Sequence, residues 1–121
     1  MSTTSTITFD AAALKAAIES RDAAALLDLY ADDAEVEIAD AEHGPSSPLR
    51  AKGKDALRAV FADVYGREIT HSVGPVAVSG DSLGYVVRCT YPDGIRVLCA
   101  AGAELRDGRI ARETCVQAWD S

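Results

Sequence analysis

Apolar positions at helical spacing open the chain. Leu14 and Ile18 repeat on one face, and Asp10 stands just before them. The Asp10 carboxylate can accept hydrogen bonds from free backbone amides, and Phe9 and Leu14 have the spacing of a hydrophobic staple. The pattern therefore predicts a helix that begins at Asp10.

A second apolar stripe follows after a break at Arg21-Asp22. Asp22 can cap a helix in the same way, and Leu26, Leu27 and Tyr30 then form one apolar face. We predict a second short helix that ends at Tyr30.

The next segment changes its period from helical to alternating. Glu35 and Glu37 alternate with Val36 and Ile38, which is typical of a half-buried strand opening near Asp33. Residues 40–50 have no period and contain Gly44, Pro45 and Pro48, so we expect a loop there. A third helix is predicted from about Lys54, with apolar residues at helical spacing: Leu57, Val60, Phe61 and Val64.

The rest of the chain predicts a meander of four strands with turns at Gly80-Asp81, Asp93-Gly94 and Asp107-Gly108. If the first two turns are two-residue loops, one face of the meander carries His71, Arg88, Thr90, Val97, Cys99 and Ala101. A bulge at Gly74-Pro75 would change the placement of His71.

The register of the last hairpin has two readings. A three-residue loop with a glycine bulge at Arg106-Asp107-Gly108 puts Glu113, Cys115 and Gln117 on the same face as Cys99. A two-residue loop puts them behind it. We favour the bulge, which the family resemblance below also supports.

Composition and charge narrow the class of protein. The 121 residues are 48% hydrophobic and carry a net charge of -7, which suits one domain over residues 1–121 and disfavours nucleic acid as a partner. No secretory leader or membrane span is visible, so we expect a cytoplasmic protein that does not bind membranes. The cysteines, Cys89, Cys99 and Cys115, have no metal-finger spacing and are expected to be reduced.

Several segments together resemble the nuclear transport factor 2-like superfamily, which includes ketosteroid isomerases, scytalone dehydratase, limonene epoxide hydrolase and SnoaL-like polyketide cyclases. The segments are IESRDAAALLDLYADDAEVE, GKDALRAVF, ITHSVGPVAVSGD and LRDGRIARE. The resemblance implies an α+β fold, with three N-terminal helices packed on a strongly curved, mainly antiparallel sheet that forms a cone with an open pocket.

The resemblance also tests known mechanisms against this sequence. The ketosteroid isomerase base matches Ile38, and its oxyanion-hole residues match Leu14 and Ala101. The acids of the epoxide hydrolases match Thr90 and Cys115, and a cyclase acid also falls near Cys115. None of these positions holds the required side chain.

The scytalone dehydratase pattern is the one that survives. Its acid and histidine match Glu19 and His71. A carboxylate beside an imidazole fixes the tautomer and stabilises the protonated ring, which favours proton transfer near neutral pH. Arg88 is predicted to stabilise an enolate or bind a carboxylate. The predicted pocket lining comprises Ile18, Tyr30, Ile38, Phe61, Val86, Thr90, Cys99, Ala101, Glu113, Cys115, Gln117 and Trp119.

Three functions follow as hypotheses. The first is a dehydratase, isomerase or cyclase that uses His71, Glu19 and Arg88 on a small apolar carbonyl compound, without cofactor or metal. The others are a non-catalytic ligand-binding protein and a structural dimer with a filled cone. A homodimer is expected through an outer face formed by Tyr85, Val87, Cys89, Leu98 and Ala100.

Overall fold

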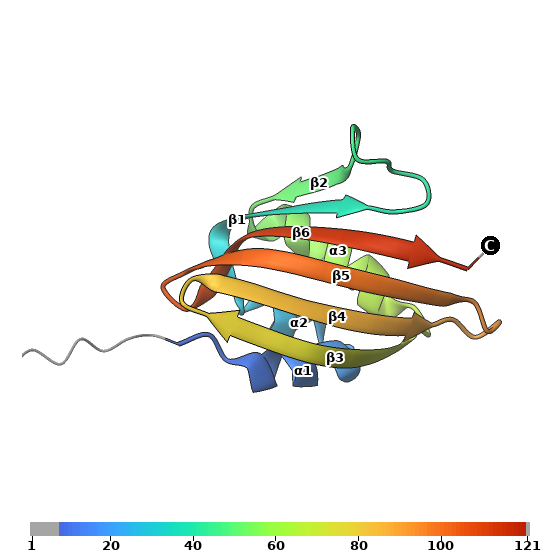
Figure 1. The fold of residues 1–121 in the computed structure, drawn as a ribbon, viewed down its shortest axis with the longest axis horizontal. Coiled ribbons are helices and arrows are strands. Elements are labelled where there is room, and N and C mark those ends of the chain that lie inside the picture. The colour runs from blue at the N-terminus through green and yellow to red at the C-terminus, as the bar shows by residue number, and fades with distance from the viewer. Residues whose placement is uncertain (1–7, 121) are drawn as a thin grey trace, which may run out of the picture.

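A computed structural model describes residues 8–120. Most of the N-terminal segment MSTTSTITFD, in which no secretory leader was recognised, lies outside these residues. Six strands form one sheet in the order β2-β1-β6-β5-β4-β3, with β1 and β6 parallel and the other neighbours antiparallel (Figure 1). The elements are α1 (Ala11–Glu19), α2 (Ala23–Leu27), β1 (Tyr30–Ala39), β2 (Leu49–Lys52), α3 (Lys54–Gly66), β3 (Thr70–Ser79), β4 (Ser82–Thr90), β5 (Arg96–Arg106) and β6 (Arg109–Trp119).

The two short helices begin where their capping residues predict. Asp10 accepts a hydrogen bond from the Ala13 amide and Asp22 accepts one from the Ala25 amide, both at 3.0 Å. Arg21 separates the helices in a left-handed conformation with φ 56°. The second helix ends at Leu27, earlier than expected, because the chain enters the sheet: the Ile110 amide donates to the Leu29 carbonyl at 2.9 Å.

The third helix, α3, starts at Lys54 as predicted. The expected loop over residues 40–50 was too long, since its end belongs to β2, which pairs Leu49 with Ile38 and Lys52 with Glu35. Four residues between a proline and a glycine are too few to show an alternating pattern, so the sequence did not reveal this edge strand.

The hairpin of β3 and β4 has the predicted two-residue loop at Gly80-Asp81, where Ser79 faces Ser82. The register then shifts by one residue between Val73 and Val76, where Gly74-Pro75 forms a bulge. As a result His71 faces Cys89 and not Thr90.

The hairpin of β4 and β5 differs from the prediction by one residue. The Tyr91 amide donates to the Ile95 carbonyl at 2.9 Å, which leaves a three-residue loop with Gly94 at φ 91°. Thr90 therefore faces Arg96, and a one-residue slip moves every side chain of β4 to the opposite face. Val86, Arg88 and Thr90 point outward, while Tyr85, Val87 and Cys89, which were predicted to lie outside, point inward.

The last hairpin places β6 on the predicted side of the sheet, but with a different loop and bulge from those expected. Asp107 and Gly108 form a two-residue loop with φ of 53° and 75°, the backbone of a tight hairpin turn. Ala111 is then an extra residue in β6, because Leu105 faces Ile110 whereas Glu104 faces Arg112. This bulge restores the face, so Glu113 and Cys115 lie on the same side of the sheet as Cys99.

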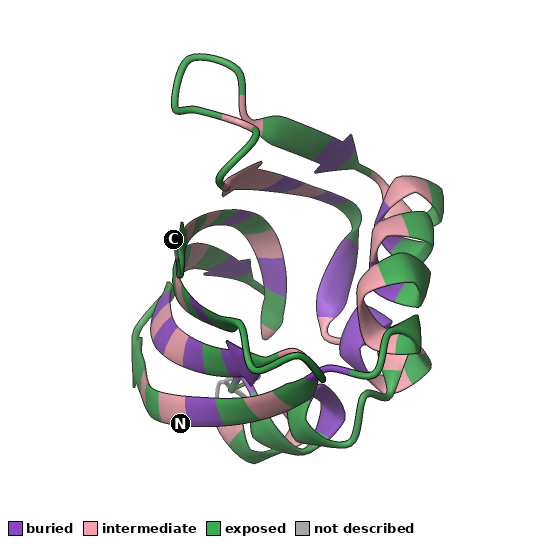
Figure 2. Cartoon of the chain, turned by 90° about the vertical axis from the view of Figure 1, so that its right-hand side faces the viewer, coloured by how far each residue is buried: buried purple, intermediate pink, exposed green. Residues whose placement is uncertain are grey.

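The helices cover the concave side of the curved sheet (Figure 2). Helix α1 packs on β3, and α3 packs on β1 and β2. The most deeply buried side chains come from both layers and are Leu14, Ile18, Leu26, Leu57 and Ile110. This arrangement is the predicted α+β cone. Over residues 8–120, none of the helices is sufficiently long and apolar to span a membrane.

Candidate functional site

A cavity of about 760 Å³ lies between the concave face of the sheet and the helices. It has the size and the largely apolar lining of a small-molecule site. The cone is therefore open and not filled by its own side chains. Of the residues predicted to line it, ten do so: Ile18, Tyr30, Ile38, Phe61, Cys99, Ala101, Glu113, Cys115, Gln117 and Trp119.

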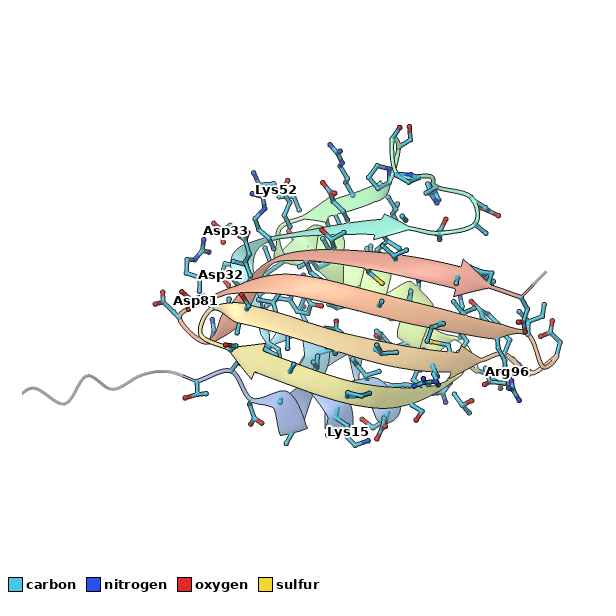
Figure 3. All side chains as sticks on the ribbon, in the orientation of Figure 1. Lys15, Asp32, Asp33, Lys52, Asp81 and Arg96 are labelled. Carbon is cyan, nitrogen blue, oxygen red and sulfur yellow. The ribbon has the colours of Figure 1, made fainter. Side chains whose placement is uncertain are left out.

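The strand registers order the cavity wall from its mouth to its closed end. We call the row His71, Cys89, Val97 and Trp119 the mouth rung, since each faces the next across β3, β4, β5 and β6. Trp119 is 39% exposed. Three side-chain positions deeper along β6, Glu113 lies beside Val36 and Ala103, in the buried part of the core. The charged residues Asp33, Lys52 and Asp81 lie outside this closed end (Figure 3).

The closed end holds a buried carboxylate between two tyrosines. The Tyr30 hydroxyl donates to Oε1 of Glu113 and the Tyr85 hydroxyl donates to Oε2. Glu113 is 5% exposed and is the one charged side chain buried within residues 8–120. Burial raises the pKa of Glu113, and the hydrogen bonds from Tyr30 and Tyr85 oppose that rise. We call these three residues the carboxylate centre.

The environment of the carboxylate centre also shifts the pKa values of its two tyrosines. Burial and then the charge of Glu113 raise the pKa values of Tyr30 and Tyr85 well above the ordinary value of a phenol. Both hydroxyls therefore keep their protons and act as hydrogen-bond donors.

A row of aromatic rings joins the carboxylate centre to the mouth rung. Ring centroids lie 5.2 Å apart for Tyr30 and Phe61, 6.1 Å for Phe61 and Tyr65, and 5.1 Å for Tyr65 and His71. Phe61 and Tyr65 come from α3, one helical turn apart. Rings from α3, β1 and β3 therefore line the cavity between the carboxylate centre and the mouth rung.

The sheet side of the cavity carries the three thiols. Nδ1 of His71 lies 3.3 Å from Sγ of Cys89, and Cys99 and Cys115 also line the cavity. A hydrogen bond with Cys115, followed by burial and the proximity of Cys115, raises the pKa of Cys99 to about 12, although bonds with Cys89 and Gln117 oppose it. A hydrogen bond with Cys99 and then burial raise the pKa of Cys89. Cys89 and Cys99 are therefore thiols near neutral pH and poor nucleophiles.

The predicted pair of Glu19 and His71 does not form. Oε2 of Glu19 accepts from Nζ of Lys15 at 2.7 Å and from the Val73 amide at 2.9 Å. These two bonds, led by that from Lys15, lower the pKa of Glu19. Glu19 lies at the end of α1 and reaches only a shallow surface groove that His71 also borders. It serves β3 as a cap for Val73 and does not orient the imidazole.

Arg88 was expected to act in the cavity, but the slip in β4 places it on the outer face, where it is exposed. Val86 and Thr90 leave the predicted lining for the same reason. On β4 it is Tyr85 that faces the cavity, where its hydroxyl donates to Glu113. The sequence analysis placed Tyr85 on the outer face. The residues of β4 alternate between the two faces, so the correct register would have turned Tyr85 toward the cavity.

The loop between β1 and β2 borders the cavity mouth. Oδ1 of Asp40 lies 2.8 Å from Nδ1 of His43 and accepts from the amides of His43 and Glu42 at 2.8 Å and 2.9 Å. Burial raises the pKa of Asp40, but the bonds from His43 and Glu42 outweigh it and hold that pKa below its ordinary value. The contacts fix the loop at the mouth. Within residues 8–120, no three histidine, cysteine or acidic side chains group closely enough to hold a metal ion.

Solved structures resemble this fold over most of the chain. A candidate ketosteroid isomerase from Kribbella flavida shares 21% identity with a TM-score of 0.73, covering 92% of this chain and 75% of its own. An NTF2-like protein of unknown function from Mesorhizobium loti shares 20% identity with a TM-score of 0.76, covering 87% and 84%. A candidate polyketide cyclase from Sinorhizobium meliloti shares 22% identity with a TM-score of 0.64, covering 84% and 88%.

At these identities the likeness shows the fold alone. Among curated proteins, none matches the chain. The family model of the SnoaL-like domain matches residues 11–113. The chain therefore belongs to the SnoaL-like domain family, and its fold is that of the NTF2-like structures.

Proposed function

We propose that the protein is a proton-transfer enzyme, of the isomerase, dehydratase or cyclase type, that acts on an apolar carbonyl compound in the cone cavity. The observation that carries this proposal is Glu113, a carboxylate buried at the closed end of the cavity and held by two tyrosine hydroxyls. Glu113 takes the role of base that the sequence had assigned to the His71 imidazole paired with Glu19.

Burial equips Glu113 to act as a base. A carboxylate withdrawn from water is less well solvated than one at the surface, so it takes up a proton more readily. Its raised pKa makes the carboxylate a stronger proton acceptor than one at the surface, and the same group can later return the proton. The apolar lining, with Phe61 and Val87, keeps competing water away from a bound substrate.

The hydrogen bonds of the carboxylate centre allow a balanced proton transfer. At the start Tyr30 and Tyr85 each donate to one oxygen of Glu113. When Glu113 takes a proton from the carbon next to a substrate carbonyl, the new carboxyl O–H donates to one of the two phenol oxygens. The O–H of that tyrosine is then released and turns to the enolate oxygen, where charge develops. Return of the proton to another atom of the substrate restores the starting state.

The structural neighbours support this reaction class. Proteins with the same cone are named as a candidate ketosteroid isomerase and a candidate polyketide cyclase. Both names, ketosteroid isomerase and polyketide cyclase, refer to a carbonyl compound. The cavity here offers a base and two phenols where such a compound would bind.

Deuterium exchange at a ketone probe tests the proposal. With 2-tetralone in D₂O, the protein should speed exchange of the protons beside the carbonyl, followed by NMR. Glu113→Gln should lower the protein-dependent rate by about 100-fold or more, the usual contribution of a general base. Glutamine keeps an oxygen acceptor and an amide donor for the two tyrosines, so the fold should persist.

Glu104→Gln provides the matched control, since Glu104 is exposed on the neighbouring strand. It should leave the exchange rate unchanged. Equal rates for the parent and Glu113→Gln would contradict the proposal. If 2-tetralone still bound in the cavity under those conditions, a non-catalytic binding protein would be the better account.

A further inference from the structure

Glu113 is a buried charge without a counter-charge in the described part of the chain. It is 5% exposed, and no lysine, arginine or histidine among residues 8–120 forms an ion pair with it. Its two oxygens each accept from a neutral phenol hydroxyl, which is the hydrogen-bonding pattern of an ionised carboxylate. A glutamate is almost never fully buried unless it is paired with a positive charge. Glu113 therefore lacks the positive group that such a site ordinarily contains.

The aromatic side chains of the protein are concentrated around the same cavity. The chain has four tyrosines, two phenylalanines and one tryptophan. All of them except Phe9 line the cavity: Tyr30, Phe61, Tyr65, Tyr85, Tyr91 and Trp119. The face of an aromatic ring carries partial negative charge and attracts organic cations, most strongly where water is excluded. A cavity that combines such rings with a buried carboxylate has the chemistry of an ammonium site.

The charges of the cavity lining favour a ligand of the same sign. Within residues 8–120, four carboxylates line the cavity, those of Asp40, Glu42, Asp63 and Glu113. Nη2 of Arg67 lies 2.8 Å from Oδ2 of Asp63, and Nδ1 of His43 lies 2.8 Å from Oδ1 of Asp40, so these two basic groups of the lining are already paired. The whole chain carries a net charge of -7. A positive ligand is attracted into such a cavity, and a negative one is repelled.

We propose that the cavity binds an apolar organic cation, a positively charged nitrogen carried on a hydrophobic body, with Glu113 as its counter-charge and the rings of Tyr30 and Phe61 beside it. An inorganic cation fits this place poorly, because one carboxylate and two protonated phenols supply too few oxygen ligands. The inference goes beyond the proposed function, since it needs the charge of Glu113 and not a proton transfer. A cation bound there competes with the carbonyl compound for the same carboxylate.

Two probes of the same shape test the inference. In 4-(trimethylammonio)benzyl alcohol, a positively charged nitrogen replaces the quaternary carbon of 4-tert-butylbenzyl alcohol. Water solvates the cation better than the neutral alcohol, so an apolar cavity without a counter-charge should prefer the neutral probe. By isothermal titration calorimetry, the parent protein should instead bind the cation about tenfold more tightly.

Three variants separate the contributions to this preference. Glu113→Gln should lose the preference for the cation, while its unchanged affinity for the neutral alcohol shows that the cavity persists. In Phe61→Leu, the ratio of the two affinities should fall about threefold or more, because a ring is lost while the lining stays apolar. Glu104→Gln is the control, since Glu104 is exposed on β5, and it should keep the tenfold preference.

The outcomes distinguish this inference from the proposed function. Equal or weaker binding of the cation by the parent, or a preference that persists in Glu113→Gln, would overturn the inference. Exchange at 2-tetralone that is lost in Glu113→Gln would still leave the proposed function standing. Conversely, a preference lost in Glu113→Gln together with unchanged exchange would support the cation site and contradict the proton-transfer enzyme.

Discussion

Tyr30 donates a hydrogen bond to Glu113, a residue 83 positions further along the chain, at the buried closed end of the cavity. The contact joins the first strand of the sheet to the last. A buried carboxylate is costly unless it is hydrogen-bonded, and here Tyr85 completes its partners. The two phenols therefore allow the fold to keep a charged group where a ligand can reach it.

Removing one phenol should change both the titration and the stability. In Tyr85→Phe, Glu113 loses a donor that favours its charged form, so its pKa should rise further. The free energy of unfolding should fall by about 1.5 to 3 kcal/mol, as for other hydrogen bonds to a charged group. NMR of the Glu113 side-chain carboxyl and urea unfolding measure the two effects. Tyr91→Phe is the control, since Tyr91 lies at the mouth. A pKa that falls in Tyr85→Phe would contradict the assigned donor.

The stability of the protein should depend on pH through Glu113. Its pKa is raised on folding, so the folded state binds the proton more tightly than the unfolded state. The corresponding stabilisation is complete below the ordinary value of 4.5 and is lost as the pH rises through the folded value. Glu113→Gln should thus gain stability relative to the parent across that window, by at most about 1.4 kcal/mol per pH unit. Urea unfolding at several pH values measures this. A difference that stays constant with pH would show that Glu113 titrates alike in both states.

The thiols should be present but slow to react. Cys89 is buried, and Cys99 and Cys115 are partly buried. All three are free cysteines and form no disulfide. Raised pKa values of Cys89 and Cys99 keep the thiolate fraction small. Iodoacetamide at pH 8 should modify the native protein at Cys89 and Cys99 much more slowly than the urea-unfolded chain. Without reductant, the unfolded chain should show three additions by intact mass. Fewer additions would indicate a bridge.

We propose a homodimer through the outer face of the sheet, which keeps the predicted Leu98 and Ala100 but loses the predicted residues of β4. Leu98 and Val116 are 45% and 55% exposed on neighbouring strands, and Val86 and Ala100 lie on the same face. Val116→Glu should give monomers or aggregates in sedimentation at micromolar concentration. Ala62→Glu, on the exposed side of α3, should not change the assembly. A parent protein that sediments as a monomer would refute the proposed dimer.

The sequence predicted the architecture because its signals are local. Asp10 and Asp22 cap helices through amides three residues away, and the glycine turns mark the hairpins. These interactions act within a few residues, so they can be recognised without knowledge of the whole fold. The family resemblance then supplied the arrangement in space.

The candidate site was harder to predict because it depends on register. A bulge at Gly74-Pro75 and a longer loop at Gly94 each shift the pairing by one residue, and the two shifts cancel for His71. The segment between the two shifts, β4 together with the end of β3 that pairs with it, is reversed. The predicted register turned Arg88 toward the cavity and Tyr85 away from it, so the contact between Tyr85 and Glu113 was not foreseen. A slip of one residue costs little locally but exchanges the two faces of a strand.

The pH dependence of deuterium exchange at 2-tetralone tests the central claim most directly. If Glu113 is the base, the protein-dependent rate should rise with pH through one midpoint above 4.5, matching the titration of the Glu113 carboxyl. The midpoint should move higher in Tyr85→Phe and stay in place in His71→Phe. A rate that does not follow the ionisation of Glu113, or a midpoint lost in His71→Phe, would contradict the account.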